Sequence, residues 1–319
     1  MLQFRLIVPA DLTDEVAELI TSTVGATHLT LLKGAALDPV GDLMTCDVAR
    51  EAADPLLAGL RGLGLEERGL IAVDSVDMSL SRRSEDAERD APGEGADAVL
   101  WDSMAELTEE ESTLTVTYLA FLSVATMLAA YGVMLDSSIL IVGAMAVGPE
   151  FGPLAGICTG LVIRRKRLVA RSAKALVVGF LAAMLITGAF AALLDLFGLF
   201  SRSQFERPHP ATQFIWQPTA DSFVVALLAG IAGVLSLTSA KSGALVGVAI
   251  SVTTVPAAAN AALALSYSSW HEVLGSAWQL ALNLAGIVAA GLLTLLVQKW
   301  VWHRQRERAA STSASMSSR

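Results

Sequence analysis

Apolar residues dominate the chain after residue 113, in runs that are long enough to cross a bilayer. A membrane-spanning helix needs about 20 consecutive, mostly apolar residues. The runs are Leu114–Leu135, Ser138–Ile163, Ala175–Phe200, Ser222–Ser239, Ser242–Leu265 and Val273–Trp302. The pattern predicts an α-helical integral membrane domain of six spans over residues 114–303, followed by a disordered cytoplasmic tail over residues 304–319.

The second run is interrupted at its middle by Gly148, Pro149, Gly152 and Pro153, and an acid, Glu150, lies inside the interruption. Because proline lacks a backbone N–H and clashes with the preceding turn, two prolines four residues apart predict a broken helix. Non-helical backbone is tolerated at membrane depth only where protein or water satisfies its polar groups. An acid in such a break therefore indicates a functional site.

The fifth run resembles the second. Ser138-Ile-Leu-Ile-Val-Gly143 and Ser242-Gly-Ala-Leu-Val-Gly247 share Ser, Val and Gly at the same spacing, and Pro256 interrupts the fifth run as Pro149 interrupts the second. Each run is the second in a set of three, and three is odd, so the second set must enter the membrane the other way up. This predicts a 3+3 inverted repeat with broken second and fifth helices and a site near the bilayer midplane. Coincidence is the alternative, since Ser, Gly and Val are common in membrane helices.

Residues 1–80 have a different pattern, in which short β-rich runs alternate with amphipathic helical segments. The expected elements are a strand at Gln3–Val8, a helix from Asp11, strands at His28–Leu32 and Leu43–Val48, a helix at Asp54–Leu63 and a strand at Leu70–Leu80. Their order, β-α-β-β-α-β, predicts a small α+β ferredoxin-like domain. This domain is a folding or oligomerisation module, or a regulatory ligand-binding domain. His28 is expected to be an isolated surface residue of its strand.

Residues 81–113 read as a linker. The charged, Gly- and Ala-containing stretch from Arg82 to Asp97 predicts a flexible tether. Apolar side chains between Val99 and Leu107 share one helical face, which predicts a short amphipathic helix. Thr108 and Glu111 have the spacing of a capping box, which would start the first membrane helix.

The distribution of charged residues predicts how the chain is oriented in the membrane. Residues 1–113 hold 24 of the 31 acidic residues and 8 of the 22 Lys and Arg, so this part is acidic and a poor candidate for binding nucleic acid. The cluster Arg164–Arg167, Lys241 and Lys299 fall on one side of a six-span arrangement. The positive-inside rule makes that side cytoplasmic, together with both termini, in the cell membrane. Cys46 and Cys158 lie in different parts of the chain, so no disulfide is expected.

The candidate residues for binding a substrate or ion lie at the two breaks. They are Ser138, Gly148, Pro149, Glu150, Gly152, Pro153, Thr253, Thr254, Pro256 and Asn260. Glu150 would accept a proton or coordinate a cation, or it would only cap backbone amides freed by the break. The hydroxyl and amide side chains near Pro256 would line a site, or would replace lost backbone hydrogen bonds. No spacing typical of a metal or cofactor site occurs, and none is expected.

The stretch Gly143-Ala-Met145, Pro149, Gly152-Pro153-Leu-Ala-Gly-Ile157 and Gly160-Leu-Val162 resembles a family of bacterial and archaeal membrane proteins catalogued as domain of unknown function 389. The likeness covers about residues 110–300. Where that family has Pro-Leu-Met-Gly-Pro, this chain has Pro149-Glu-Phe-Gly-Pro153, so the acid is a departure from the pattern. The resemblance implies an integral membrane protein and supplies no substrate.

These patterns together favour a transporter or channel for a small solute or ion, regulated or assembled through the soluble domain. A membrane sensor or scaffold without transport is the alternative. An enzyme acting on lipid headgroups is less favoured, because clustered His, Asp and Glu ligands are missing from the sequence. Membrane lipid is the expected surrounding, and the glycine-rich spans favour a homo-oligomer.

Overall fold

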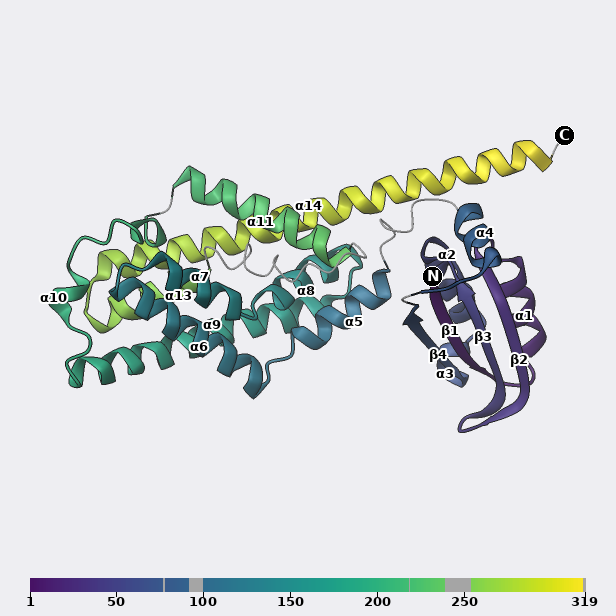
Figure 1. The fold of residues 1–319 in the computed structure, drawn as a ribbon, viewed down its shortest axis with the longest axis horizontal. Helices are drawn as coiled ribbons and strands as arrows, with labels where there is room; N and C mark the ends of the chain where they lie inside the picture. The colour runs from purple at the N-terminus through teal and green to yellow at the C-terminus, as the bar shows by residue number, and fades with distance from the viewer. Residues whose placement is uncertain (77, 92–99, 218, 239–253, 318–319) are drawn as a thin grey trace. The chain divides into compact units, whose positions relative to one another are not determined.

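The structure is a computed structural model, which describes residues 1–76, 78–91, 100–217, 219–238 and 254–317 (Figure 1). The chain divides into two compact units. The first consists of Met1–Leu100 with Lys299–Arg319, and the second of Trp101–Gln298.

The first unit contains a four-stranded antiparallel sheet in the order β2-β3-β1-β4. Its elements are β1 (Leu2–Val8), α1 (Thr13–Ser22), β2 (Ala26–Leu37), β3 (Val40–Val48), α2 (Arg50–Gly62), α3 (Leu65–Arg68), β4 (Leu70–Ser75) and α4 (Arg82–Asp90). Alternate residues of β1, from Leu2 to Val8, are buried, because strand side chains point to opposite faces in turn. They form one core with the apolar faces of α1 and α2.

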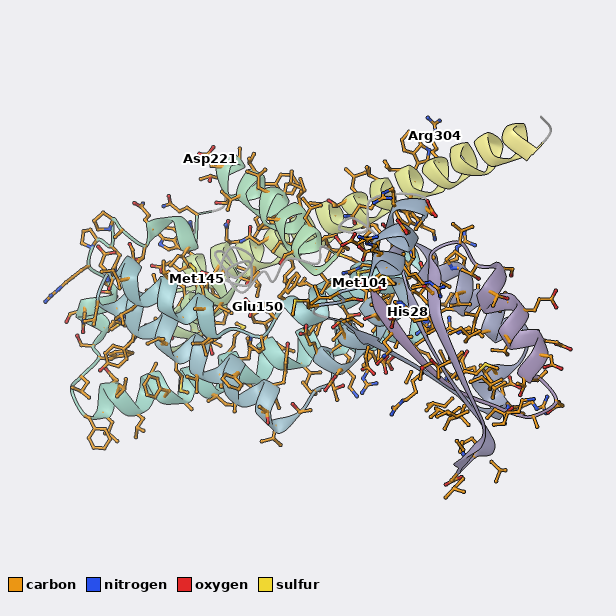
Figure 2. The ribbon with its side chains drawn as sticks, turned by 45° about the vertical axis from the view of Figure 1, so that its right-hand side comes forward. His28, Met104, Met145, Glu150, Asp221 and Arg304 are labelled. Atoms are coloured by element: carbon orange, nitrogen blue, oxygen red, sulfur yellow. The ribbon has the colours of Figure 1, made fainter. Side chains whose placement is uncertain are left out.

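Two features of this unit differ from the expectation. Part of the predicted tether is helical, as α4. His28 is not isolated: its Nδ1 lies 2.8 Å from Asp47 Oδ2, and its Nε2 lies 3.0 Å from Ser81 Oγ (Figure 2). The register of β2 shifts between Thr27 and Thr30, and such irregularities re-aim a side chain. His28 thereby links the sheet to the residue that precedes α4.

The second unit is helical. Its elements are α5 (Trp101–Glu111), α6 (Val116–Met134), α7 (Ser138–Val147), α8 (Phe151–Val162), α9 (Lys166–Leu196), α10 (Arg202–Phe205), the 3-10 helix η2 (Gln213–Ile215), α11 (Ala220–Thr238), α13 (Val255–Ser266) and α14 (Trp270–Ser317), the last of which continues into the first unit. Within the described residues α6, α9, α11 and residues 270–302 of α14 are long and apolar enough to cross a membrane. The pair α7 and α8 would form a fifth span, bent by 54°. These apolar helices indicate a membrane-embedded protein, in which α7 and α8 form a broken span or a re-entrant loop.

The predicted fifth span, Ser242–Leu265, is only partly described, because residues 242–253 lie outside the described residues. Its second half is α13, which has 12 residues and is too short to cross a bilayer alone.

Helix boundaries repeat along the second unit at an offset of 104 residues. α6 spans residues 116–134 and α11 spans 220–238. α8 spans 151–162 and α13 spans 255–266. α9 begins at Lys166 and α14 at Trp270, and the preceding turns contain the left-handed residues Arg164 (φ 61°) and Ser268 (φ 59°). Among the described residues, α6 and α11 therefore have equal lengths, as do α8 and α13, and α9 and α14 begin at equivalent positions.

Some boundaries differ from those expected. Thr108 does not cap the first span: it lies inside α5, where its hydroxyl donates to Met104 O, and Thr115 caps α6 by accepting from Tyr118 N. The third span starts within the basic cluster, at Lys166. α14 continues to Ser317, where a disordered tail was expected, because residues 303–317 contain no proline or glycine and many good helix formers.

Candidate site at the broken membrane helix

The break lies between Val147, the last residue of α7, and Phe151, the first residue of α8. Gly148 occupies the C-cap of α7 and Glu150 the N-cap of α8. Pro153 falls in the first turn of α8, where a missing N–H leaves no hydrogen bond unmade. The two prolines therefore end one helix and start the next.

Glu150 is buried, with 1% of its surface exposed (Figure 2). The hydroxyl of Thr254 donates a 2.9 Å hydrogen bond to its Oε1 atom. Thr254 is itself the N-cap residue of α13, so the amino ends of α8 and α13 meet at this carboxylate. The amino end of a helix carries partial positive charge, which stabilises an anion there. Glu150 makes no side-chain cap hydrogen bond to α8, and its hydrogen bond with Thr254 joins it to α13.

Gly148 provides the space for this arrangement. A β-carbon at Gly148 would overlap Oε2 of Glu150 and would lie 3.0 Å from Cγ2 of Val255. The carboxylate therefore folds back over the glycine to reach α13. Pro256, the second residue of α13, is buried beside this junction.

Gly152 and Gly156 of α8 lie against the carboxyl end of α5 and the residue that follows it. A β-carbon at Gly152 would overlap Glu111, and one at Gly156 would lie 2.6 Å from Ser112 Oγ. Ser172 of α9 donates a 2.8 Å hydrogen bond to Ser112. Gly152 thus contributes to helix packing rather than to the surroundings of Glu150.

Exposed ion pairs attach α5 to the start of α9. Arg171 lies 3.0 Å from Glu109 and also donates to Thr113, and Arg165 lies 3.3 Å from Asp102.

Asn260 lies on α13 but its amide does not bond Glu150. Its amide nitrogen donates to Ser276 Oγ at 2.9 Å and to Glu272 Oε2 at 3.4 Å, both on α14. Asn260 and Glu272 line a cavity of about 300 Å³. The loop from Phe205 to Trp216 supplies most of the remaining lining.

The structure thus brings together Gly148, Glu150, Thr254 and the first turn of α13 with Pro256. Pro149 is the half-buried link in the break. Ser138 is not part of this group: it is exposed at the other end of α7, and the neighbouring Ser137 caps that helix by accepting from Leu140 N. Thr253 lies outside the described residues.

Two residues near these features were not singled out from the sequence. Tyr118 of α6 has a buried hydroxyl with no hydrogen-bond partner among the described residues, and it is close enough to Glu150 for the two groups to interact electrostatically. Asp136 accepts hydrogen bonds from Ala211 N and Thr212 Oγ1, both at 3.1 Å, and so anchors the loop over the cavity. A tyrosine in a span and an acid at its end carry no local pattern that would reveal these contacts.

Comparison with known proteins gives one match. Residues 145–289 match the family described as "Domain of unknown function (DUF389)", from the end of α7 to the middle of α14. No curated protein and no solved structure matches the chain. The matched region contains the break, Glu150, Thr254 and Asn260. Over residues 145–289 the chain is therefore similar to this family, which confirms the resemblance that Met145, Pro149 and Gly152-Pro153 carried in the sequence.

Proposed function

We propose that this membrane protein is a transporter or channel for a small solute or ion, with its binding site at Glu150 and Thr254. The observation that carries the proposal is a buried carboxylate at the meeting point of two helix amino ends, where one span is broken and α13 begins. Paired discontinuous helices of this kind form the midplane sites of secondary transporters.

The proposal includes a 3+3 inverted repeat. The offset of 104 residues that relates the helix boundaries also relates Glu150 to Thr254, and these two side chains are hydrogen-bonded to each other. Residues related by a two-fold pseudosymmetry axis meet only close to that axis. With three spans in each half, the second half enters the membrane the other way up, and the breaks of both halves face each other at mid-depth.

The proposal also gives an orientation. The basic segment from Arg164 to Lys174 lies on the cytoplasmic side of the cell membrane, together with both termini. The soluble unit is then cytoplasmic, where it regulates the membrane unit or assembles copies of it into a homo-oligomer.

Flux measurements test the proposal. The purified protein is reconstituted in liposomes, and uptake of ²²Na⁺, ⁸⁶Rb⁺ and protons (with an internal pH dye) is measured. We expect transport of at least one probe, and a loss of about tenfold or more with Glu150→Gln or Thr254→Val, because each removes a polar contact worth at least about 1.4 kcal/mol. Asp221→Asn and Thr117→Val, at exposed positions, are the matched controls. Wild-type rates in the Glu150→Gln variant would refute the site, and a protein that moves no probe would favour the scaffold alternative.

A further inference from the structure

A row of polar residues runs along one face of α14. Glu272, Ser276, Gln279 and Asn283 follow each other at intervals of four, three and four residues, which places them on one stripe of a helix. Ser276, Gln279 and Asn283 are each at most 1% exposed. We call these four residues the polar stripe. Buried polar groups at membrane depth are costly, and they mark either helix–helix contacts or the path of a polar ligand.

The equivalent positions of α9 show that a helix at this place can pack without polar side chains such as those of the stripe. The residues 104 positions earlier, on α9, are Leu168, Ser172, Ala175 and Gly179. On α9, Ser172 donates to Ser112, and Gly179 lies against Tyr118 and Leu122 of α6. Only the serine is common to both halves. The carboxylate and the two amides are additions on α14.

The polar stripe opens into the cavity at one end. Glu272 and Asn260 lie in the lining of the 300 Å³ cavity, and Asn260 bonds both Glu272 and Ser276. The cavity mouth carries both signs of charge, with Glu206 and Arg207, so the mouth itself does not select for charge. Glu272 is therefore the residue of the stripe that a ligand in the cavity meets first, with Asn260 beside it and Ser276 next along α14.

The other end of the stripe lies at about the same position along the helix axes as Glu150. α13 and α14 form an antiparallel hairpin with a short turn at Tyr267–Ser269, and Asn260 is paired with Ser276. Six residues back along α13, about 9 Å, is Thr254, and seven residues forward along α14, about 10 Å, is Asn283. A second contact gives the same level. Cys158 of α8 donates to Val288 O at 3.5 Å, and Glu150 lies about 12 Å before Cys158, which corresponds to a point on α14 between Gln279 and Asn283.

The chemistry of the stripe suits a cation. Glu272 supplies a carboxylate at the cavity end, the hydroxyl of Ser276 and the amides of Gln279 and Asn283 follow it, and Glu150 supplies a second carboxylate near the other end. Gln279 Oε1 has no hydrogen-bond partner among the described residues. Hard metal cations prefer such oxygen ligands, and acidic side chains along a pathway favour cations over anions. Amide groups coordinate metal ions but do not relay protons, which favours an alkali-metal ion over H⁺.

We propose that the polar stripe of α14 is the path by which Na⁺ or K⁺ passes from the cavity to Glu150. This inference rests on the proposed function, since it names the class of ion and its route to that site.

The first test does not depend on transport. In full-length protein with Cys46→Ala and Cys158→Ala, held in lipid nanodiscs, Ser276→Cys is treated with a trimethylammonium thiosulfonate or with a sulfonate thiosulfonate. We expect modification at least tenfold faster by the cationic reagent, slowed by high NaCl or KCl more than by the same concentration of choline chloride. Ala277→Cys, the next residue and off the stripe, is the unreactive control, and Thr219→Cys, in the exposed loop, reacts with both reagents. Failure of Ser276→Cys to react, or equal rates with both reagents, would overturn the cation path.

The second test is uptake of ²²Na⁺ and ⁸⁶Rb⁺ into proteoliposomes. Gln279→Met keeps the side-chain size and removes the amide, and we expect at least a fivefold loss of uptake. Gln298→Met makes the same change further along α14, where the amide donates to Thr238, and should keep wild-type uptake. If Glu150→Gln abolishes uptake while Gln279→Met leaves it intact, the stripe is not the path, although the site stands. Uptake of protons with neither metal ion would also overturn this inference.

Discussion

At the scale of single residues, Glu150 shows how a carboxyl group is held in place inside an apolar bundle. It lies at the amino ends of α8 and α13, and it accepts the Thr254 hydroxyl. A helix amino end stabilises a nearby anion by about 0.3–1 kcal/mol, and by up to about 2 kcal/mol in partly buried settings. Both sources of stabilisation depend on the carboxylate staying over Gly148.

Gly148→Ala tests this dependence. The added β-carbon would overlap Glu150 Oε2, the movable end of a side chain, so the carboxylate should move away from Thr254 while the fold survives. We expect ion uptake to fall severalfold while the melting temperature in detergent falls by only a few degrees. Gly143→Ala, in the same helix, has no neighbour nearer than Leu128 at 4.0 Å and should change neither. Equal effects of the two substitutions would contradict this role of Gly148.

In the soluble unit, Asp42 gives a pH-dependent prediction. The Thr13 hydroxyl and, next, the Gly34 amide bond its carboxylate at 2.7 Å each and hold the pKa of Asp42 below its ordinary value. A lowered folded-state pKa stabilises the fold above the unfolded pKa of about 3.9, and this stabilisation disappears as pH falls through the folded value.

Asp42→Asn should therefore lower hydrogen-exchange protection of β2 and β3 at pH 7. The difference from wild type should shrink as pH falls below the unfolded pKa of about 3.9 and disappear once pH is below the folded value, after correction for intrinsic exchange. Asp14→Asn, at an exposed position of α1, is the control. A difference that persists unchanged in acid would show that Asp42 acts through packing alone.

The sequence predicted the residues whose signals are local and missed those that depend on packing. Two prolines four residues apart, with two glycines beside them, interrupt a long apolar run, so the break around Glu150 was readable. Ser138 was a candidate for the site, but it lies at the far end of α7 from the break, where Ser137 caps the helix. Gln279 and Asn283 became significant only when α14 was compared with α9.

At the scale of elements, the two halves differ in what covers their short helices. α5 packs on Gly152 and Gly156 of α8. The residues 104 positions after α5 are 205–215, and these line the cavity next to α13. One half is therefore filled by a helix at the place where the other half is open. If a cavity opens next to α8 while the cavity next to α13 closes, α5 is the element that must move. α5 also directly follows the connection to the first unit.

Arg171→Gln tests how firmly α5 is held. This change removes the contacts of Arg171 with Glu109 and Thr113. An exposed ion pair contributes about 0.2–1 kcal/mol, so exchange of the α5 amides should become up to about fivefold faster. Arg167→Gln, an exposed residue in the same helix, should leave it unchanged. Unaltered exchange in the Arg171 variant would mean that apolar packing alone holds α5.

At the scale of the whole molecule, the sequence pattern identified a membrane unit after an acidic soluble unit, because span length and charge are set by the bilayer. The repeat was readable only from Ser, Val and Gly positions at 138–143 and 242–247. The equal boundaries of α6 and α11 and of α8 and α13, and the equivalent starts of α9 and α14, support the proposed repeat, because many different sequences can form helices of the same length.

Opposite insertion of the halves can be measured at two equivalent turns. Arg164 and Ser268 are both exposed and both left-handed, 104 residues apart. In the variant lacking Cys46 and Cys158, Arg164→Cys and Ser268→Cys are labelled with a membrane-impermeant maleimide in whole cells and in inside-out vesicles. We expect Ser268→Cys to react in cells and Arg164→Cys only in inside-out vesicles. Reaction of both from the same side would contradict the inverted repeat.

The most direct measurement of the central claim is a double-mutant cycle of ion uptake in proteoliposomes, with Glu150→Gln, Thr254→Val and the combination. Residues that act as one site are not additive. If the two halves form their site through this hydrogen bond, each single change should reduce uptake by about tenfold or more. The double variant should then lose no more uptake than the more impaired of the two single variants. Losses that multiply in the double variant, or wild-type uptake in either single variant, would contradict the account.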